Sequence, residues 1–193
     1  AGQLTVVRIA GSGYAPASAS VGSTAGTAFQ LFTLSDGALL NNTGSVGNAN
    51  NLLAEGTKNN IRWEVSTRNQ KKGTFTLVIR RGDDNQKRKN PLETWKDLSL
   101  DPNSANYISA RIGDQYNTFK SDDGFYLQPT GDFPNKSKYV RVASIDNTVD
   151  YLDENGNVSN ASYTASVPAL GSGSYDGAFD GGNDGVKTEG PHQ

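Results

Sequence analysis

The sequence has no cysteine, no methionine and a single histidine, His192. Without cysteine, neither a disulfide framework nor a thiolate metal site can form. A serine or cysteine nucleophile of the usual kind needs a rigidly oriented histidine base, and the one histidine lies in the glycine-rich stretch 171–193. A glycine-rich loop for nucleotide phosphates is also missing. We therefore expect no enzyme activity, no cofactor and no bound metal.

Long apolar runs are missing as well, so the sequence predicts neither a signal peptide nor a transmembrane helix. Hydrophobic residues make up 34% of the 193 residues, and the chain contains 22 glycines. Glycine, asparagine and serine in such amounts favour a β-rich fold with many turns over a helical bundle. Because the chain begins with Ala1 and contains no methionine, we expect it to be a fragment of a longer protein.

The clearest strand pattern lies between residues 61 and 100. Residues 61–66 (IRWEVS) and 74–80 (TFTLVIR) alternate apolar and polar side chains, which is typical of half-buried strands. The polar linker 67–73 (TRNQKKG) ends in glycine and predicts an antiparallel hairpin with a longer loop. Residues 92–100 alternate less cleanly and predict the third strand of a meander.

A short helix is predicted directly after this meander, at about residues 104–112. Asp101 can cap free amides, and Pro102 is tolerated at the first helical position. Ile108 and Ile112 fall on one helical face together with Ala105, and Gly113 is suited to end the helix.

Elsewhere the elements are shorter. Strands are predicted at residues 4–9, 27–34 and 138–145, and an extended piece at 115–119. Residues 11–26, rich in glycine, serine and alanine, predict a flexible connector, and 41–51 a polar loop. The stretch 171–193 has too few apolar residues to form a packed element and is predicted to be a Gly/Asp-rich tail or linker. The predicted fold class is α+β, predominantly antiparallel β with one short helix and long polar loops.

The net charge of −2 hides an uneven distribution. Residues 58–96 contain eleven lysines and arginines against four acidic residues, whereas residues 146–193 contain eight acidic residues against one lysine. Lobes of opposite charge suit head-to-tail contacts between identical copies, but ordinary solvated loops would give the same pattern. The candidate subunit contacts are Lys71, Lys72, Lys87, Arg88, Lys89, Asp176, Asp180 and Asp184.

Residues 73–81 read GTFTLVIRR and are followed at 92–114 by LETWKDLSLDPNSANYISARIGD. The order of an ET-aromatic group, LSLDP, NYI and IGD in this run resembles the middle part of contractile tail sheath proteins of myophages and related injection machines. Two flanking pieces agree with it, LTVVRI at 4–9 and FDGGNDG at 179–185. The resemblance implies a β-rich middle domain at 1–170, with a loop-rich sub-part in 11–58, and a linker toward a following domain at 171–193. The sequence leaves open whether 1–170 forms one subdomain or two.

The resemblance also implies a function. Many copies of a sheath subunit wrap a tail tube in a helical array, and contraction drives the tube through the host envelope for genome ejection. The implied partners are other copies of the subunit, and indirectly the tail tube and the baseplate; the isolated fragment is expected to be monomeric. The implied location is the virion, with assembly in the host cytoplasm. No membrane contact is expected, and no nucleic-acid contact, because acidic residues interleave with the basic run 87–89.

An alternative class fits the same composition. An extracellular β-sandwich adhesin or carbohydrate-binding module would also show alternating strands, many turns and no catalytic histidine. The two classes differ in their aromatic residues. Exposure of Tyr107, Tyr116, Tyr126 or Trp95 as a platform would favour binding, and burial of these side chains would favour a scaffold.

Overall fold

The computed structural model describes residues 14–34, 61–82, 84, 87–121, 124–171, 177, 179 and 183–184. Antiparallel strands dominate these residues and are accompanied by two short helices, which confirms the predicted α+β class. In chain order the elements are β1 (Tyr14–Ala15), β2 (Ser18–Ser23), β3 (Gly26–Thr33), β4 (Ile61–Asn69), β5 (Thr74–Arg81), β6 (Pro91–Ser99), α2 (Ile108–Ile112), β7 (Tyr116–Lys120), β8 (Tyr126–Thr130), β9 (Val140–Ile145), α3 (Tyr163–Ser166) and β10 (Asn183–Asp184).

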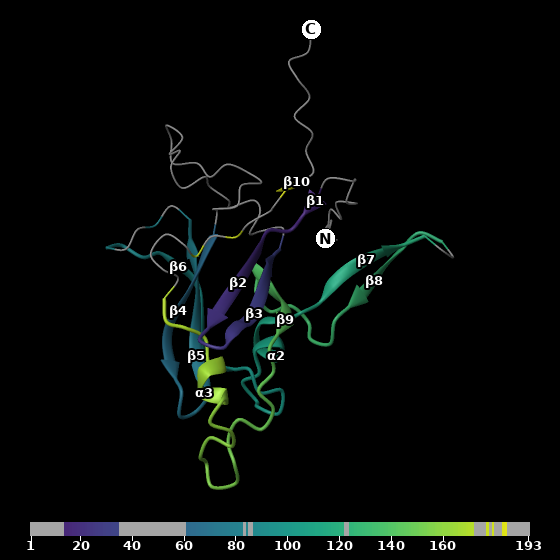
Figure 1. The fold of residues 1–193 in the computed structure, drawn as a ribbon. Helices are drawn as coiled ribbons and strands as arrows, with labels where there is room; N and C mark the ends of the chain where they lie inside the picture. The colour runs from purple at the N-terminus through teal and green to yellow at the C-terminus, as the bar shows by residue number, and fades with distance from the viewer. Residues whose placement is uncertain are drawn as a thin grey trace.

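Two three-stranded antiparallel sheets contribute to one hydrophobic core (Figure 1). One sheet has the strand order β2-β3-β9 and the other the order β4-β5-β6. The rings of Phe29 on β3 and Phe75 on β5 stack between them with centroids 5.5 Å apart. Both side chains are fully buried, so this stacked pair marks where the two sheets meet.

The predicted meander is confirmed, with a shorter first loop than expected. β4 continues to Asn69, so only residues 70–73 connect it to β5. Gly73 has a φ of +65°, and a Cβ there would lie 2.6 Å from ring atoms of Tyr151. The loop is therefore tight because glycine both turns the chain and lets the Tyr151 ring approach.

The predicted helix ends where expected, at Gly113, but begins only at Ile108. Residues 101–107 form turns instead, because side chains take over the local hydrogen bonding. The Asp101 carboxylate accepts hydrogen bonds from the main-chain N–H of Asn103 and of Tyr151, at 2.9 and 3.0 Å. Ile108 and Ile112 are buried as expected, whereas Ala105 is exposed.

The prediction of a flexible connector at 11–26 is wrong for residues 18–23, which form β2. Ala19 and Val21 point into the core and alternate with exposed Ser20 and Gly22. The apolar side chains of β2 are small, but their alternation with exposed residues still places them in the core. The strands expected at 27–34, 115–119 and 138–145 are confirmed as β3, β7 and β9.

The prediction that residues 171–193 form no packed element is wrong for the part of this stretch that the structure describes. Phe179 is fully buried in the core, and β10 pairs with β1. Along the edge of β4, the N–H of Gly171 donates to the carbonyl of Val65 at 2.8 Å, and the N–H of Trp63 donates to the carbonyl of Gly177 at 2.8 Å. The main chain of this stretch thus pairs with main-chain N–H and C=O groups at the edge of β4. Such hydrogen bonds need few apolar side chains.

Three predictions lie outside the described residues: the strand at 4–9, the loop at 41–51 and most of the sub-part at 11–58. The division into a domain at 1–170 and a linker at 171–193 stays a prediction.

Candidate functional site

The described residues hold no cluster of three or more metal-ligating side chains. One open depression of about 130 Å³ lies beside β9, lined by Tyr107, Asp114 and Asn147 among others. Small-molecule sites usually enclose about 300–1,000 Å³ and are mostly apolar, so this depression is a poor ligand site. Neither helix in the described ranges is long and apolar enough to cross a membrane. The features that stand out are instead surfaces of charged and aromatic residues.

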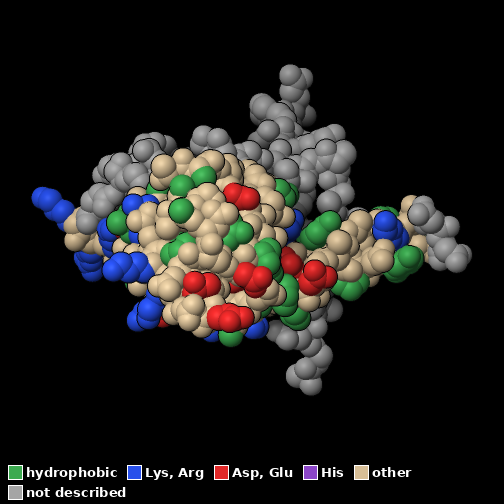
Figure 2. All heavy atoms as spheres, turned by 60° about the horizontal axis from the view of Figure 1, so that its bottom comes forward, with side chains coloured by type: hydrophobic (Ala, Val, Ile, Leu, Met, Phe, Trp, Pro, Cys, Tyr) green, Lys and Arg blue, Asp and Glu red, His purple; other side chains and the backbone are tan. Residues whose placement is uncertain are grey.

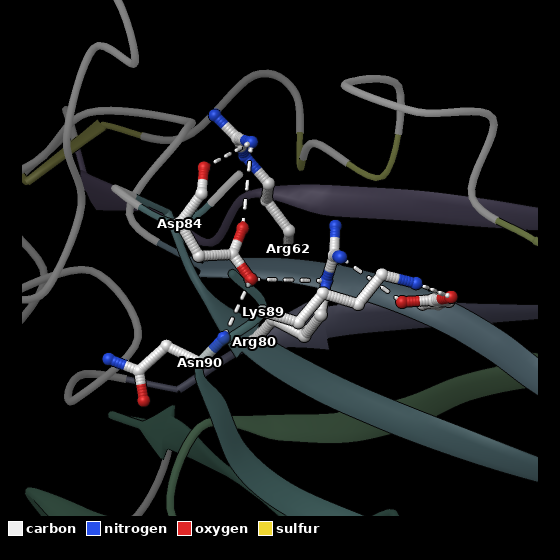
Figure 3. Close-up of polar contacts among 6 residues, drawn as sticks. Arg62, Arg80, Asp84, Lys89 and Asn90 are labelled. Atoms are coloured by element: carbon white, nitrogen blue, oxygen red, sulfur yellow. Dashed lines mark hydrogen bonds and ion pairs between the residues drawn. The ribbon is translucent and has the colours of Figure 1, made fainter. Parts of the chain in front are cut away.

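A buried group of charged side chains connects β4, β5 and the loop that follows β5. Arg62 and Arg80 lie directly opposite each other in the β4–β5 ladder, an arrangement that would be repulsive on its own. The carboxylate of Asp84 lies between them, with Oδ1 3.7 Å from Arg62 Nη1 and Oδ2 3.5 Å from Arg80 Nε (Figure 3). Arg80 is only 2% exposed, so these charges are compensated inside the protein rather than by water.

The same group holds the basic loop between β5 and β6 in place. Glu64 on β4 lies 3.1 Å from Arg80 Nη1 and also binds the ammonium group of Lys89 at 2.5 Å (Figure 3). Asp84 Oδ2 additionally accepts a hydrogen bond from the main-chain N–H of Asn90 at 3.0 Å. Two ends of the loop are thus tied to the sheet, and this fixes where the basic run 87–89 is presented.

The predicted basic contacts are all exposed, but they are not equivalent. Lys71 and Lys72 lie in the β4–β5 turn, where their main-chain N–H groups bond to the side chain of Asn69. Lys87 and Arg88 lie in the β5–β6 loop. Lys89 forms an ion pair with Glu64 of its own chain. Sequence reasoning placed these residues on the surface correctly but missed this internal ion pair.

The predicted acidic contacts fall largely outside the described residues. This applies to Asp176 and Asp180, whereas Asp184 is described only through its main-chain pairing with Tyr14. Other acidic residues of the same half are exposed on described loops: Asp146, Asp150, Asp153 and Glu154. Figure 2 shows acidic side chains gathered along the lower part of the face it presents and basic side chains mostly at its left edge. Among the described residues, acidic and basic side chains thus gather on different parts of this face.

The β7–β8 hairpin extends away from the two sheets (Figure 1). Its five strand pairs run from Tyr116 opposite Thr130 to Lys120 opposite Tyr126. Five of the eight exposed large hydrophobic side chains in the described residues belong to it: Tyr116, Phe119, Phe125, Tyr126 and Leu127. Sequence reasoning predicted an extended piece at 115–119 but did not single out Phe119, Phe125 or Leu127. The available signal was a second short apolar run, FYL at 125–127, after a turn.

The exposure of four aromatic residues distinguishes a binding platform from a scaffold, and two of the four are partly buried while two are exposed. Trp95 and Tyr107 are partly buried against the core, with hydrogen bonds from the indole N–H to Glu93 and from the phenol to Asn147. Tyr116 and Tyr126 are about half exposed on the hairpin, at 45% and 50%. Among the described residues, the sheets bury their aromatic side chains fully or in part, and the exposed aromatic side chains belong to the hairpin.

No protein-family model matches this chain, and neither the curated proteins nor the solved structures compared with it include a significant match.

Proposed function

We propose that this chain is part of the subunit of a contractile tail sheath, a structural virion protein whose copies surround a tail tube. Its role is mechanical: it presents surfaces through which neighbouring copies stay in register while the array changes its packing. The partners are other copies of the subunit, with the tube and baseplate touched indirectly, and the place of action is the phage tail after assembly in the host cytoplasm.

The observation that carries this proposal is the position of the residues that resemble sheath proteins. The segment 73–114 folds into β5, β6 and α2, which supply one side of the core. The buried apolar residues of this segment that pack there are Phe75, Leu77, Ile79, Leu98, Leu100, Ile108 and Ile112. The motifs on which the resemblance rests thus lie on consecutive elements that pack into the core, which supports the proposal.

Immunogold electron microscopy tests the proposal. Antibodies raised against this chain would be applied to a lysate of the cells that produce it. Regular labelling along contractile tails is the expected result. Bare tails with label on cell surfaces or fibre tips would contradict the proposal and favour an adhesin.

The charged lobes can be tested as subunit contacts by reversing Lys71 and Lys72 to glutamate in the assembling subunit. These two residues give a cleaner test than Lys89, whose reversal would also break the ion pair with Glu64. If the lobes touch, the double variant should assemble less completely at low salt and lose salt sensitivity, because exposed ion pairs are screened. Unchanged assembly with unchanged salt sensitivity would remove the electrostatic role.

An adhesin or carbohydrate-binding module is the second candidate, favoured by the exposed Tyr116 and Tyr126 on the hairpin. Aromatic rings stack on the apolar faces of sugars, so a module of this class would bind glycans in isolation. Titration of the chain with a set of plant, bacterial and animal polysaccharides should show no binding if the chain is a sheath part. Binding that is lost in Tyr116→Ala or Tyr126→Ala would support the second candidate instead.

A further inference from the structure

Asn155 and Gly156 form the one Asn-Gly dipeptide of the sequence. They lie in the loop between β9 and α3, at the bottom of the molecule in Figure 1. In this loop the main-chain N–H of Asp153 donates to the carbonyl of Asn157 at 2.7 Å, and the N–H of Gly156 donates to the carbonyl of Asp153 at 2.9 Å. Residues 153–157 are therefore a short hydrogen-bonded turn, and we call them the Asn-Gly turn.

The Asn-Gly turn is accessible to solvent throughout. All of its residues are exposed. Gly156 has a φ of +78°, and a Cβ built on it would meet no atom within 4 Å. In the described part of the chain, the side-chain amide of Asn155 makes no hydrogen bond. The Asn155 side chain can therefore turn toward the main-chain nitrogen of Gly156 without breaking a contact.

Other exposed asparagines differ from Asn155 in two ways. Their side chains have partners: Asn103 Nδ2 donates to Asp150 at 2.8 Å, and Asn147 Oδ1 accepts a hydrogen bond from the Tyr107 hydroxyl group at 3.1 Å. They are also followed by serine and threonine rather than by glycine. A side chain on the following residue hinders the approach to its main-chain nitrogen, whereas glycine permits a close approach. Both differences favour reaction at Asn155.

We propose that Asn155 is a site of spontaneous deamidation, with water as the co-reactant. A base from the solvent takes the proton of the Gly156 N–H, and the nitrogen attacks Cγ of Asn155. The new N–Cγ bond closes a cyclic succinimide, while the Cγ–Nδ2 bond breaks and the amide nitrogen takes up a proton and leaves as ammonia. Water then adds to one of the two ring carbonyl carbons and breaks the bond of that carbon to nitrogen. The product has aspartate or isoaspartate in place of Asn155.

The fold controls the rate of this reaction through Asp153. Its Oδ1 accepts hydrogen bonds from the main-chain N–H groups of Asn155 and Asn157, at 2.9 and 2.8 Å. Its carbonyl accepts the N–H of Gly156, the group that must lose its proton. The attack therefore requires the turn to open, and because every residue of the turn is exposed, a local fluctuation is enough. Asp153 thus slows deamidation in the folded chain without preventing it.

Deamidation changes the surface at this turn but not the fold. Either product adds a negative charge beside Asp153. Isoaspartate also routes the main chain through the former side chain and lengthens it by one atom, so the hydrogen bonds of the turn cannot all form again. The change stays local because Tyr151, just before the turn, is held by the bond from its main-chain N–H to Asp101 at 3.0 Å.

Peptide mapping by mass spectrometry tests the site. The full chain would be incubated in mildly alkaline buffer under folding conditions and digested, and each asparagine would be examined for the mass gain that accompanies conversion of an amide to an acid. We expect conversion at Asn155 to be several-fold faster than at any other asparagine that the structure describes. Conversion at Asn155 that is no faster than at Asn103 or Asn147 would overturn the inference.

The role of the turn is tested by Asp153→Ala, with Glu154→Ala as the matched control. Both variants remove one negative charge next to Asn155, but the control leaves the hydrogen bonds of Asp153 in place. In the folded chain, Asp153→Ala should deamidate several-fold faster than Glu154→Ala. In concentrated urea, where the turn is lost, the two variants should deamidate at similar rates.

Two results would contradict control by the turn. One is equal rates for Asp153→Ala and Glu154→Ala in the folded chain. The other is an excess for Asp153→Ala that persists unchanged in urea, because then the effect belongs to the local sequence and not to the fold. The inference does not depend on the proposed function, which immunogold labelling tests separately.

Discussion

The two-sheet core and the β7–β8 hairpin both consist of antiparallel strands, but they differ in how many of their side chains are buried. In β5, Phe75, Leu77 and Ile79 are buried in the core, and Thr76 and Arg80 on the other face are buried too. In β8, all five residues are exposed. The difference teaches that strand formation and stability are separate: the core supplies the free energy of folding, and the hairpin supplies accessible surface.

We expect the largest difference in unfolding free energy between alanine variants of two phenylalanines, one in the core and one on the hairpin. Phe75→Ala removes a ring that is 1% exposed and stacked on Phe29, so we expect the free energy of unfolding to fall by about 4 kcal/mol. Phe119→Ala on the hairpin should change it by less than about 0.5 kcal/mol. Urea unfolding of both variants checks this, and equal losses would contradict the comparison.

The next effect concerns charge. Asp84→Asn leaves Arg62 and Arg80 facing each other inside the protein, and breaking such a buried pair should cost about 3 kcal/mol. Lys120→Gln on the hairpin should cost less than about 0.5 kcal/mol. Thermal and urea unfolding of the two variants provide the measurement. A loss in Asp84→Asn as small as that in Lys120→Gln would show that the buried network does not stabilise the core.

Two glycines allow a third comparison. Gly73→Ala places a methyl group at φ +65° and 2.6 Å from the Tyr151 ring, so we expect a loss of about 2 kcal/mol in unfolding free energy. Gly124→Ala in the hairpin also has a positive φ, +108°, but meets no atom within 4 Å. Its strain should loosen the hairpin, seen as faster amide exchange there, while global unfolding shifts by less than about 0.5 kcal/mol. A global loss equal to that of Gly73→Ala would mean that hairpin and core unfold together.

The smallest effect is that of a hydroxyl group. Tyr151 donates a hydrogen bond to the carbonyl of Gln70, and Tyr151→Phe should cost about 1 kcal/mol at neutral pH. The exposed Tyr126 on the hairpin is the matched control, since Tyr126→Phe should leave the unfolding free energy unchanged. Urea titrations of both variants test this difference.

The same tyrosine should affect stability at high pH. Burial raises the pKa of Tyr151 above its ordinary value of about 10. The unfolded chain therefore loses the phenolic proton first, so the contribution of Tyr151 is complete below about pH 10 and is lost as the pH rises through the folded-state pKa. Tyr151→Phe should fall less steeply above pH 10 than the natural chain. Burial also raises the pKa of Tyr107, and nearby Asp114 and Asp132 add to it, so a residual slope should persist.

Strands with large apolar side chains could be predicted from the sequence, whereas a strand with small side chains could not. Large apolar residues in alternation, such as Trp63 and Ile79, predicted the meander. Alternation of Ala19 and Val21 with small polar residues carries the same information, but a stretch rich in glycine, serine and alanine also predicts a connector. The late start of α2 could not be predicted, because Asp101 binds the main chain of Tyr151, fifty residues away. The role of Gly171 and Gly177 at the edge of β4 rests on main-chain bonds that composition does not reveal.

The candidate surface was predictable in part. The basic residues are exposed as their charge indicates, yet the pairing of Lys89 with Glu64 depends on strand register. The exposure of Phe119 and Leu127 cannot be predicted from the sequence, for a physical reason. Apolar residues that alternate with polar ones predict that one face of a strand is buried. The pattern does not say whether the surface that covers this face belongs to the same chain.

Hydrogen–deuterium exchange tests the division between core and hairpin most directly. Amides of β5 and of β7–β8 would be followed in the dilute chain. We expect β5 to be protected and the hairpin to exchange quickly. A hairpin as protected as β5 would contradict the account.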